Sequence, residues 1–204
     1  ENDPFSAGRQ MNAHFVTKNV DENGDWLDLA NQKNTSSDMA PTAGQMPRAL
    51  GLALASKLFR NVEALKDFKN LSNNGNEICF CTIGDASTSE GHFWETVNAA
   101  GVLQVPLAIF VWDDGYGISV PKKYQTTKES ISEILKGFQR ENGGNGYEIF
   151  KTKGWDYAHL CETYEKAAKV CREQHVPVLV HVEEVTQPQG HSTSGSHERY
   201  KSKE

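Results

Sequence analysis

The chain has 204 residues, of which 37 % are apolar and 24 % are charged, and its net charge is −6. This length is enough for one α/β domain with its own core. The lysines and arginines are scattered through an acidic chain, which argues against a nucleic-acid-binding surface. No segment approaches the ~18 consecutive apolar residues of a membrane-spanning helix. We therefore expect neither nucleic acid nor a membrane as a partner.

The start of the chain and its cysteines bear on where the protein resides. The first residues, 1–4, look like neither a signal peptide nor a transit peptide and lack an initiator methionine, so we expect a fragment of a longer protein. The four cysteines form no Cys-x-x-Cys pair, and Cys79 and Cys81 alternate with apolar residues in one predicted strand. Reduced, buried thiols are the simplest interpretation. We expect a cytoplasmic protein, with the mitochondrial matrix as the alternative.

The first part of the chain changes from irregular to regular structure. Residues 1–40 are polar and rich in Asn, Asp and Gly, which predicts long irregular loops of functional importance. Leucines recur at every fourth residue from Leu50, a helical spacing that predicts a helix over 44–60. A short second helix is expected over 61–71, followed by an Asn-rich turn.

Apolar strands and amphipathic helices then alternate along the chain. The expected strands are 77–83, 106–111, 147–150 and 177–183. The expected helices are 89–100, closed by Gly101, then 128–140 and 156–174, and the tail 186–204 is predicted to be irregular. This alternation predicts an α/β fold with a doubly wound parallel sheet and helices on both faces. We expect residues 1–204 to form a single domain.

Two acidic loops follow successive predicted strands. Asp85 comes after the first, in residues 84–91, and Asp114 comes after the second, in residues 112–117. A strand–helix–strand unit places parallel strands side by side, so both carboxylates should meet at the carboxyl edge of the sheet. Ligands of open α/β sheets bind at that edge. Hard oxygen ligands there suit Mg²⁺, and a helix N-terminus after Asp85 would favour a phosphate.

Each loop also has an ordinary interpretation. Gly-Asp after a strand is commonly a turn, and Asp-Asp-Gly is common in solvated loops. The two loops together, on successive strand ends with a helix between them, favour a site for Mg²⁺ and a diphosphate.

Four sequence blocks extend this pattern, at residues 43–51, 84–91, 113–121 and 189–194. In this order they resemble the α-type half of the first component of 2-oxo acid dehydrogenase complexes. These thiamine-diphosphate-dependent enzymes include the pyruvate and branched-chain dehydrogenases. The resemblance runs from about residue 8 to residue 201, and the parent protein could be a fused α–β chain. It implies the thiamine-diphosphate-binding fold.

The resemblance implies a set of cofactor contacts. Asp85 and the side chain of Asp114 would hold Mg²⁺, with the backbone carbonyl of Tyr116 as a third ligand. The other contacts it implies are Gly84, the backbone N–H groups of Ala86 and Ser87 at the diphosphate, Thr42 and Ala43 near the aminopyrimidine ring, and Ile118.

There are two candidate catalytic residues, and the first comes from the resemblance. His191 matches the family's active-site histidine, which is thought to assist the 2-oxo acid or the acyl transfer to lipoamide. Glu90 has two equally weighted interpretations, as a charge favoured by a helix N-terminus or as part of a proton path near the cofactor. Residues 192–194 match a loop that is phosphorylated in some relatives. His181, which alternates into a buried strand, is predicted to be a hydrogen-bonded core histidine.

Two positions depart from the family's Gly-Asp-Gly and Asn-Asn motifs. Ala86 replaces a glycine, which is harmless if its φ is negative and costly otherwise. Asp113 and Asp114 replace the two asparagines. A second carboxylate on Mg²⁺ would cancel more of its charge, so Asp114 is either a compensated ligand or a sign of weaker cofactor binding.

The function implied is oxidative decarboxylation of a 2-oxo acid with acyl transfer to lipoamide, this domain anchoring thiamine diphosphate and Mg²⁺. The partners implied are a β-type half that supplies the activating glutamate and a lipoyl-bearing acyltransferase, in a homo- or hetero-oligomer. The isolated fragment is expected to be inactive, and the sequence does not identify the 2-oxo acid.

Three alternatives stay open at this point. A transketolase-like transferase would use the same cofactor, but residues 190–194 favour the dehydrogenase. A phospho-acceptor receiver domain would want its acidic pair on the first strand and a lysine on the last, and residues 177–183 contain no lysine. A non-catalytic assembly fragment is the third interpretation.

Overall fold

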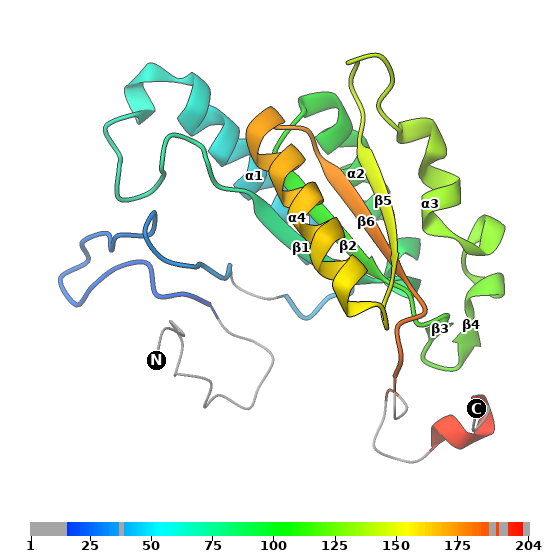
Figure 1. Ribbon diagram of the computed structural model, residues 1–204. Helices are drawn as coiled ribbons and strands as arrows, with labels where there is room; N and C mark the ends of the chain where they lie inside the picture. Colours follow the sequence, from blue (N-terminus) through cyan, green and yellow to red (C-terminus); the bar gives the residue numbers. More distant parts are fainter. Residues whose placement is uncertain (1–15, 37–38, 188–190, 192–195, 202–204) are drawn as a thin grey trace.

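A four-stranded parallel sheet organises the computed structural model, which describes residues 16–36, 39–187, 191 and 196–201. The strand order is β1-β2-β6-β5 (Figure 1). The strands are β1 (Cys79–Gly84), β2 (Leu107–Trp112), β5 (Glu148–Lys153) and β6 (Val178–Glu183). Gly84 pairs with Trp112 and Trp112 with Val182, so the carboxyl ends of β1, β2 and β6 meet at one edge.

Helices cover both faces of this sheet, which confirms the predicted α/β fold (Figure 1). α1 (Gln45–Asn61) and α2 (Gly91–Leu103) pack on one face, and α4 (Tyr157–Gln174) packs on the other. Side chains alternate along β2 accordingly. Ile109 points into the core with α1 and α2, and Phe110 points into the core with α4. Burial on both faces explains why β2 and β6 are nearly continuous apolar runs.

The helix after β1 is longer than predicted. It continues through Gly101 to Leu103 and ends at Gln104, which has left-handed backbone angles (φ 49°). Gly101 is a packing glycine here, because a Cβ at this position would lie 3.4 Å from the Tyr147 ring. The prediction that Gly101 closes the helix was therefore wrong.

Two other predicted helices are shorter than expected. Over 128–140, Lys128 and Glu129 have positive φ (66° and 53°), which prevents a helix from beginning there. Only α3 (Ile131–Ile134) and the 3₁₀ helix η5 (Leu135–Phe138) form. Over 61–71 the structure has one 3₁₀ turn, η1 (Glu63–Leu65), and then turns that suit the Asp and Asn residues of that segment.

The other short elements lie in the connections. β3 (Tyr116–Gly117) and β4 (Val120–Pro121) form a small antiparallel hairpin after β2. The 3₁₀ helices are η2 (Ala86–Ser89), η3 (Lys122–Tyr124), η4 (Thr127–Glu129) and η6 (Ser196–Arg199). The hairpin and η6 were not predicted.

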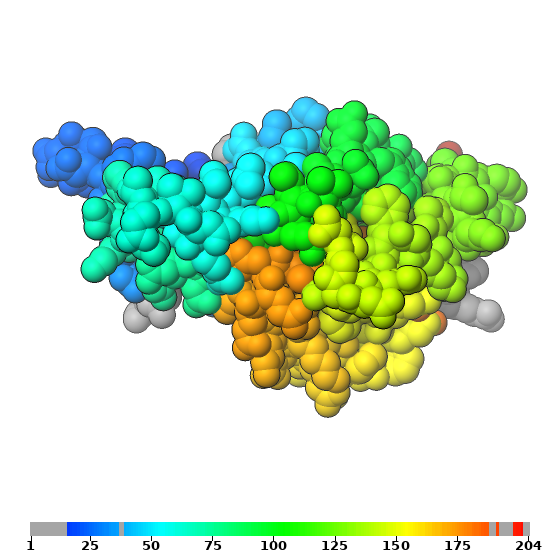
Figure 2. Space-filling view, turned by 90° about the horizontal axis from the view of Figure 1, so that it is seen from above, coloured from blue at the N-terminus to red at the C-terminus, as the bar shows by residue number. Residues whose placement is uncertain are grey.

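The segment 16–36 is irregular and lies to one side of the sheet, where it projects from the body (Figures 1 and 2). A β-bridge joins Val20 to Trp26, and the N–H of Leu29 donates to Asn70 at 2.7 Å. All four cysteines are free, as predicted. None of the helices in the described ranges has the length and apolar character needed to cross a bilayer.

Tyr147 gives a test of this packing. Its side chain is 1 % exposed, and its hydroxyl donates to the Val97 carbonyl at 2.9 Å. Tyr147→Phe removes this buried hydrogen bond, although the Val97 carbonyl keeps its place in the hydrogen bonding of α2, and should lower the free energy of unfolding by ~0.5–1.5 kcal/mol. Denaturant unfolding measures the change. Tyr157→Phe, on a side chain that is 80 % exposed, is the matched control and should change it little; equal effects would contradict the assigned packing.

Candidate active site

A cleft of about 530 Å³ opens at the carboxyl edge of β1 and β2. It is lined by Thr42, Gly84, Asp85, Ala86, Ser87, Trp112, Asp114, Tyr116, Gly117, Ile118, Val185, Thr186, Gln187 and His191. The structure thus brings nine of the eleven predicted site residues to one cleft. The exceptions are Ala43, which is buried next to Thr42, and Glu90.

Asp85 is the carboxylate placed most firmly in this cleft. Its backbone N–H donates to the Trp112 carbonyl at 3.1 Å, and its own carbonyl accepts the Thr88 hydroxyl at 2.6 Å. The residue is 5 % exposed, and Oδ2 is buried without a hydrogen-bond partner in the described part of the chain. Burial first, and then the charges of Asp113 and Asp114, raise the pKa of Asp85 to about 7. Such an orphaned oxygen is a ready ligand for a cation.

Asp113, the first residue of the acidic pair, is committed to the protein interior. Its Oδ2 accepts from Lys122 Nζ at 2.8 Å and lies 2.9 Å from His181 Nε2. Burial would raise the pKa of Asp113, but the hydrogen bonds from His181 and Lys122 outweigh burial and hold that pKa below its ordinary value. His181 is fully buried and also contacts the Ser132 hydroxyl at 2.9 Å, which confirms it as a hydrogen-bonded core histidine.

Asp114 turns toward the cleft and has its own cation. Its Oδ1 accepts the Tyr116 N–H at 3.2 Å, and its Oδ2 accepts from Lys201 Nζ at 3.1 Å. Lys201 is not among the predicted site residues. The contact spans 87 positions, and no local pattern relates the two residues.

The donor set fits Mg²⁺ better than a metal that needs a complete protein shell. Across the described ranges, no three His, Cys, Asp or Glu side chains gather as a cation site. Asp85 and Asp114 at the cleft offer two carboxylates, and Mg²⁺ characteristically takes one or two carboxylates and completes its shell with water and substrate phosphates. The open Oδ2 of Asp85 agrees with this arrangement.

Two predicted cofactor residues have strained backbones. Ala43 (φ 58°) and Ile118 (φ 57°) both lie in the left-handed region, which disfavours residues with a Cβ and β-branched residues most. Ile118 lines the cleft and is 59 % exposed. Strain of this kind persists at functional sites, where the fold fixes a side chain against a ligand.

Ala86 is well placed despite replacing a glycine. It lies in η2 and has no positive φ, so the replacement is harmless. Gly117 proves to be the more constrained glycine. A Cβ on Gly117 would lie 2.8 Å from Ala86 Cβ and 2.5 Å from the Gln125 side chain, so the hairpin can approach η2 only with glycine at this position.

The start of α1 is fastened to the cleft by two side chains. Gln45 Nε2 donates to the Thr82 carbonyl at 3.0 Å, and His92 Nε2 lies 2.8 Å from the Thr42 carbonyl oxygen. His92, which belongs to no motif in the sequence, therefore positions one wall of the cleft. The chain enters α1 sharply through the positive φ of Ala43. An alanine does not indicate such a backbone angle, so nothing in the sequence pointed to it.

The two candidate catalytic residues have different surroundings. His191 is exposed and lines the cleft. Glu90 is the exposed N-cap residue of α2 and is not among the residues that line the cleft. This position agrees with the helix-terminus interpretation, and a role in a proton path stays a prediction. Residues 192–194, matched to a phosphorylated loop, lie outside the described residues.

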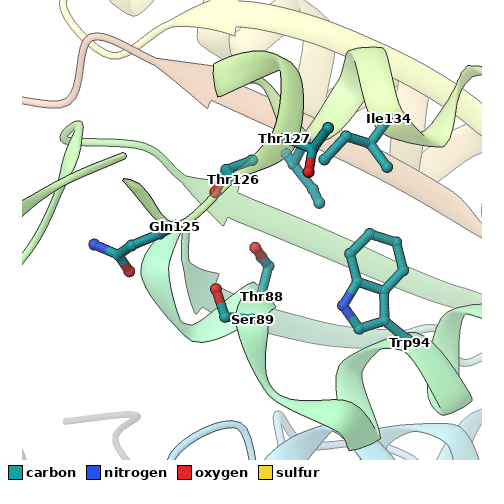
Figure 3. A pocket seen from close by; sticks show the side chains of 8 residues that line it. Thr88, Ser89, Trp94, Gln125, Thr126, Thr127 and Ile134 are labelled. Atoms are coloured by element: carbon teal, nitrogen blue, oxygen red, sulfur yellow. The ribbon is translucent and has the colours of Figure 1, made fainter. Parts of the chain in front are cut away.

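A second cavity of about 360 Å³ adjoins the first along η2. Figure 3 shows the hydroxyls of Thr88 and Ser89 with the Trp94 indole on one side and residues 125–127 with Ile134 on the other. Its lining carries no charged side chain. The charged chemistry of this edge therefore belongs to the first cleft.

Comparisons with known proteins agree with one another. The family model described as "Dehydrogenase E1 component" matches residues 9–204. The chain is 31 % identical to the α subunit of 2-oxoisovalerate dehydrogenase of Bacillus subtilis over 153 residues, or 73 % of this chain and 38 % of that protein. It is 27 % identical to the mitochondrial α subunit of the mouse 2-oxoisovalerate dehydrogenase over 98 % of this chain and 37 % of that protein.

The α subunit of the pyruvate dehydrogenase E1 component of Rickettsia bellii is 25 % identical over 78 % of this chain and 42 % of that protein. The chain therefore spans about two fifths of the length of these relatives.

The raised pKa of Asp85 predicts that the free energy of unfolding of the metal-free protein depends on pH. The folded state keeps a proton up to about pH 7 that the unfolded chain releases near its ordinary pKa of 3.8. The free energy of unfolding should therefore fall as pH rises through this window. Asp85→Asn should remove that fall and make the metal-free protein more stable at pH 8 by on the order of 1–3 kcal/mol.

Denaturant unfolding at pH 5 and pH 8 measures the effect. Asp67→Asn is the matched control, because Asp67 is exposed and is not in the cleft. Parallel pH profiles for wild type and Asp85→Asn would contradict the assignment of a buried, unpaired carboxylate.

Proposed function

The chain belongs to the dehydrogenase E1 component family, and from that premise we propose that it is the part of a 2-oxo acid dehydrogenase that binds Mg²⁺ and the diphosphate of thiamine diphosphate. The substrate class we propose is a 2-oxo acid, since two of the relatives are named for 2-oxoisovalerate and one for pyruvate. The same comparisons favour a dehydrogenase over a transketolase-like transferase.

The observation that carries this proposal is the open oxygen of Asp85. A buried carboxylate with one unpaired oxygen is costly unless a cation or a proton occupies it. Asp85 lines a cleft at the carboxyl ends of parallel strands, where ligands of such sheets bind. Asp114 at the same cleft supplies a second hard oxygen.

Different residues of the chain are proposed to hold Mg²⁺ and the diphosphate. Asp85 and Asp114 would hold Mg²⁺, with the Tyr116 carbonyl as a third oxygen. The N–H groups of Ala86 and Ser87 open η2, so neither has an acceptor within that helix, and they are proposed to bind diphosphate oxygens. Thiamine diphosphate, once bound, supplies the electron sink for breaking the bond to CO₂.

Residues in and beside the cleft are proposed to orient the organic part of the cofactor. Thr42 and Ala43, at the fixed entry to α1, are proposed to border its aminopyrimidine ring, and the exposed Ile118 gives an apolar contact. His191 is proposed to exchange a proton with the substrate or the acyl acceptor, which suits an imidazole near neutral pH.

The site also needs partners that the described residues do not supply. We propose a β-type half, separate or fused, that contributes the glutamate activating the cofactor. A lipoyl-bearing acyltransferase is the proposed acceptor of the acyl group. The names of the relatives, which call them α subunits, support an oligomeric enzyme.

Calorimetry on the complete protein with its β-type half tests the proposal. Thiamine diphosphate should bind only when Mg²⁺ is present, and Asp85→Ala should weaken that binding by about 100-fold or more, as for loss of a metal ligand. Decarboxylation of pyruvate and of branched 2-oxo acids then identifies the substrate. Binding that is independent of Mg²⁺, or that changes less than about twofold in Asp85→Ala, would rule out this assignment.

His191→Ala tests the second role. Because the side chain is exposed, the free energy of unfolding should change by less than ~0.5 kcal/mol. Reductive acylation of lipoamide should fall by about 10²-fold, as expected for loss of a general acid–base group. If turnover is unchanged while cofactor affinity falls, His191 contacts the diphosphate and has no role in proton transfer.

A further inference from the structure

Asp85 and Asp114 line the same cleft, and Asp113 directly precedes Asp114 in the chain. These carboxylates concentrate negative charge where the proposed ligand would bind. A diphosphate is itself an anion. Mg²⁺ offsets only part of this combined charge, so further positive charge must come from the protein.

Two lysines from different parts of the chain supply it. Lys122 lies 2.8 Å from Asp113 Oδ2, and Lys201 lies 3.1 Å from Asp114 Oδ2. The Asp113 side chain is only 3 % exposed and is also held by His181. Lys122 therefore pairs with Asp113, which does not line the cleft, whereas Lys201 pairs with Asp114, which does.

Lys201 is held more firmly than an ordinary surface lysine. Its side chain is 18 % exposed and its ammonium group donates to Gln187 at 3.0 Å as well as to Asp114. It also lies 4.8 Å from the centre of the Tyr116 ring, and the neighbouring Tyr200 ring lies 6.0 Å from the same ring. Three of its contacts, Asp114, Tyr116 and Gln187, line the cleft.

We propose that Lys201 is a positioning residue of the metal–diphosphate site, which weakens binding of a metal ion alone and strengthens binding of the diphosphate. This inference rests on the proposed function. An ammonium group on Asp114 repels Mg²⁺ and reduces the negative charge that the carboxylate presents to it. The same ammonium group attracts the anionic diphosphate. Lys201 therefore favours binding of the metal ion together with the diphosphate over binding of the metal ion alone.

Lys201→Met in the complete protein, with its β-type half, separates these two effects. The variant should bind Mn²⁺ alone about tenfold more tightly than the wild type does, as measured by electron paramagnetic resonance. Thiamine diphosphate at saturating Mg²⁺ should bind about tenfold more weakly by calorimetry. Lys201→Arg, which keeps the charge, should resemble wild type in both measurements.

Two further variants make the test specific. Lys169→Met removes the same charge from an exposed position on α4 and should leave both affinities unchanged. Asp114→Asn introduced together with Lys201→Met removes the carboxylate that Lys201 neutralises, so it should return both affinities toward wild type.

The outcomes are distinct. Opposite shifts in the two affinities support the proposal. Weaker binding of both ligands, or no change in either, overturns it, because a structural role for Lys201 would not change the two affinities in opposite directions. A wild-type protein that binds no thiamine diphosphate in the presence of Mg²⁺ overturns the proposed function and this inference with it. Wild-type binding with no effect of Lys201→Met overturns this inference alone.

Discussion

The structure of this cleft depends on one buried carboxylate that lacks a partner. The backbone hydrogen bond from Asp85 to Trp112 continues the pairing of β1 with β2 and fixes Asp85 at the sheet edge. Its Oδ2 is then excluded from water with no donor from the described residues. Such a group lowers the stability of the metal-free fold and favours any state in which a cation occupies it. The metal-free fold is therefore less stable, and its affinity for a cation is correspondingly higher.

The residues around Asp85 complement its carboxylate. Asp113 is withdrawn into the interior by Lys122 and His181, which leaves Asp114 as the second oxygen donor at the cleft. The hairpin β3–β4 can close over η2 because Gly117 has no side chain to collide with Ala86. The backbone is strained at Ile118, which lines the cleft, and at Ala43, next to the cleft residue Thr42.

The alternation of strands and helices was predictable because the helices carry apolar residues at helical spacing, whereas β2 and β6 are short, continuous apolar runs. The failures have tertiary causes. Gly101 looked like a helix end but packs against Tyr147, and positive φ at Lys128 and Glu129 delays a helix predicted from residue 128 until Ile131. Most of the cleft followed from the motifs. The cation on Asp114 did not, because Lys201 reaches it only through the folded chain.

Anomalous diffraction from crystals of the complete protein grown with Mn²⁺ and thiamine diphosphate tests the central claim most directly. A metal in the proposed site should lie about 2.0–2.3 Å from Asp85 Oδ2, within ligand distance of Asp114 and of a diphosphate oxygen. An ordered cofactor whose metal contacts neither carboxylate, or a metal bound elsewhere with Asp85 still unpaired, would contradict the account.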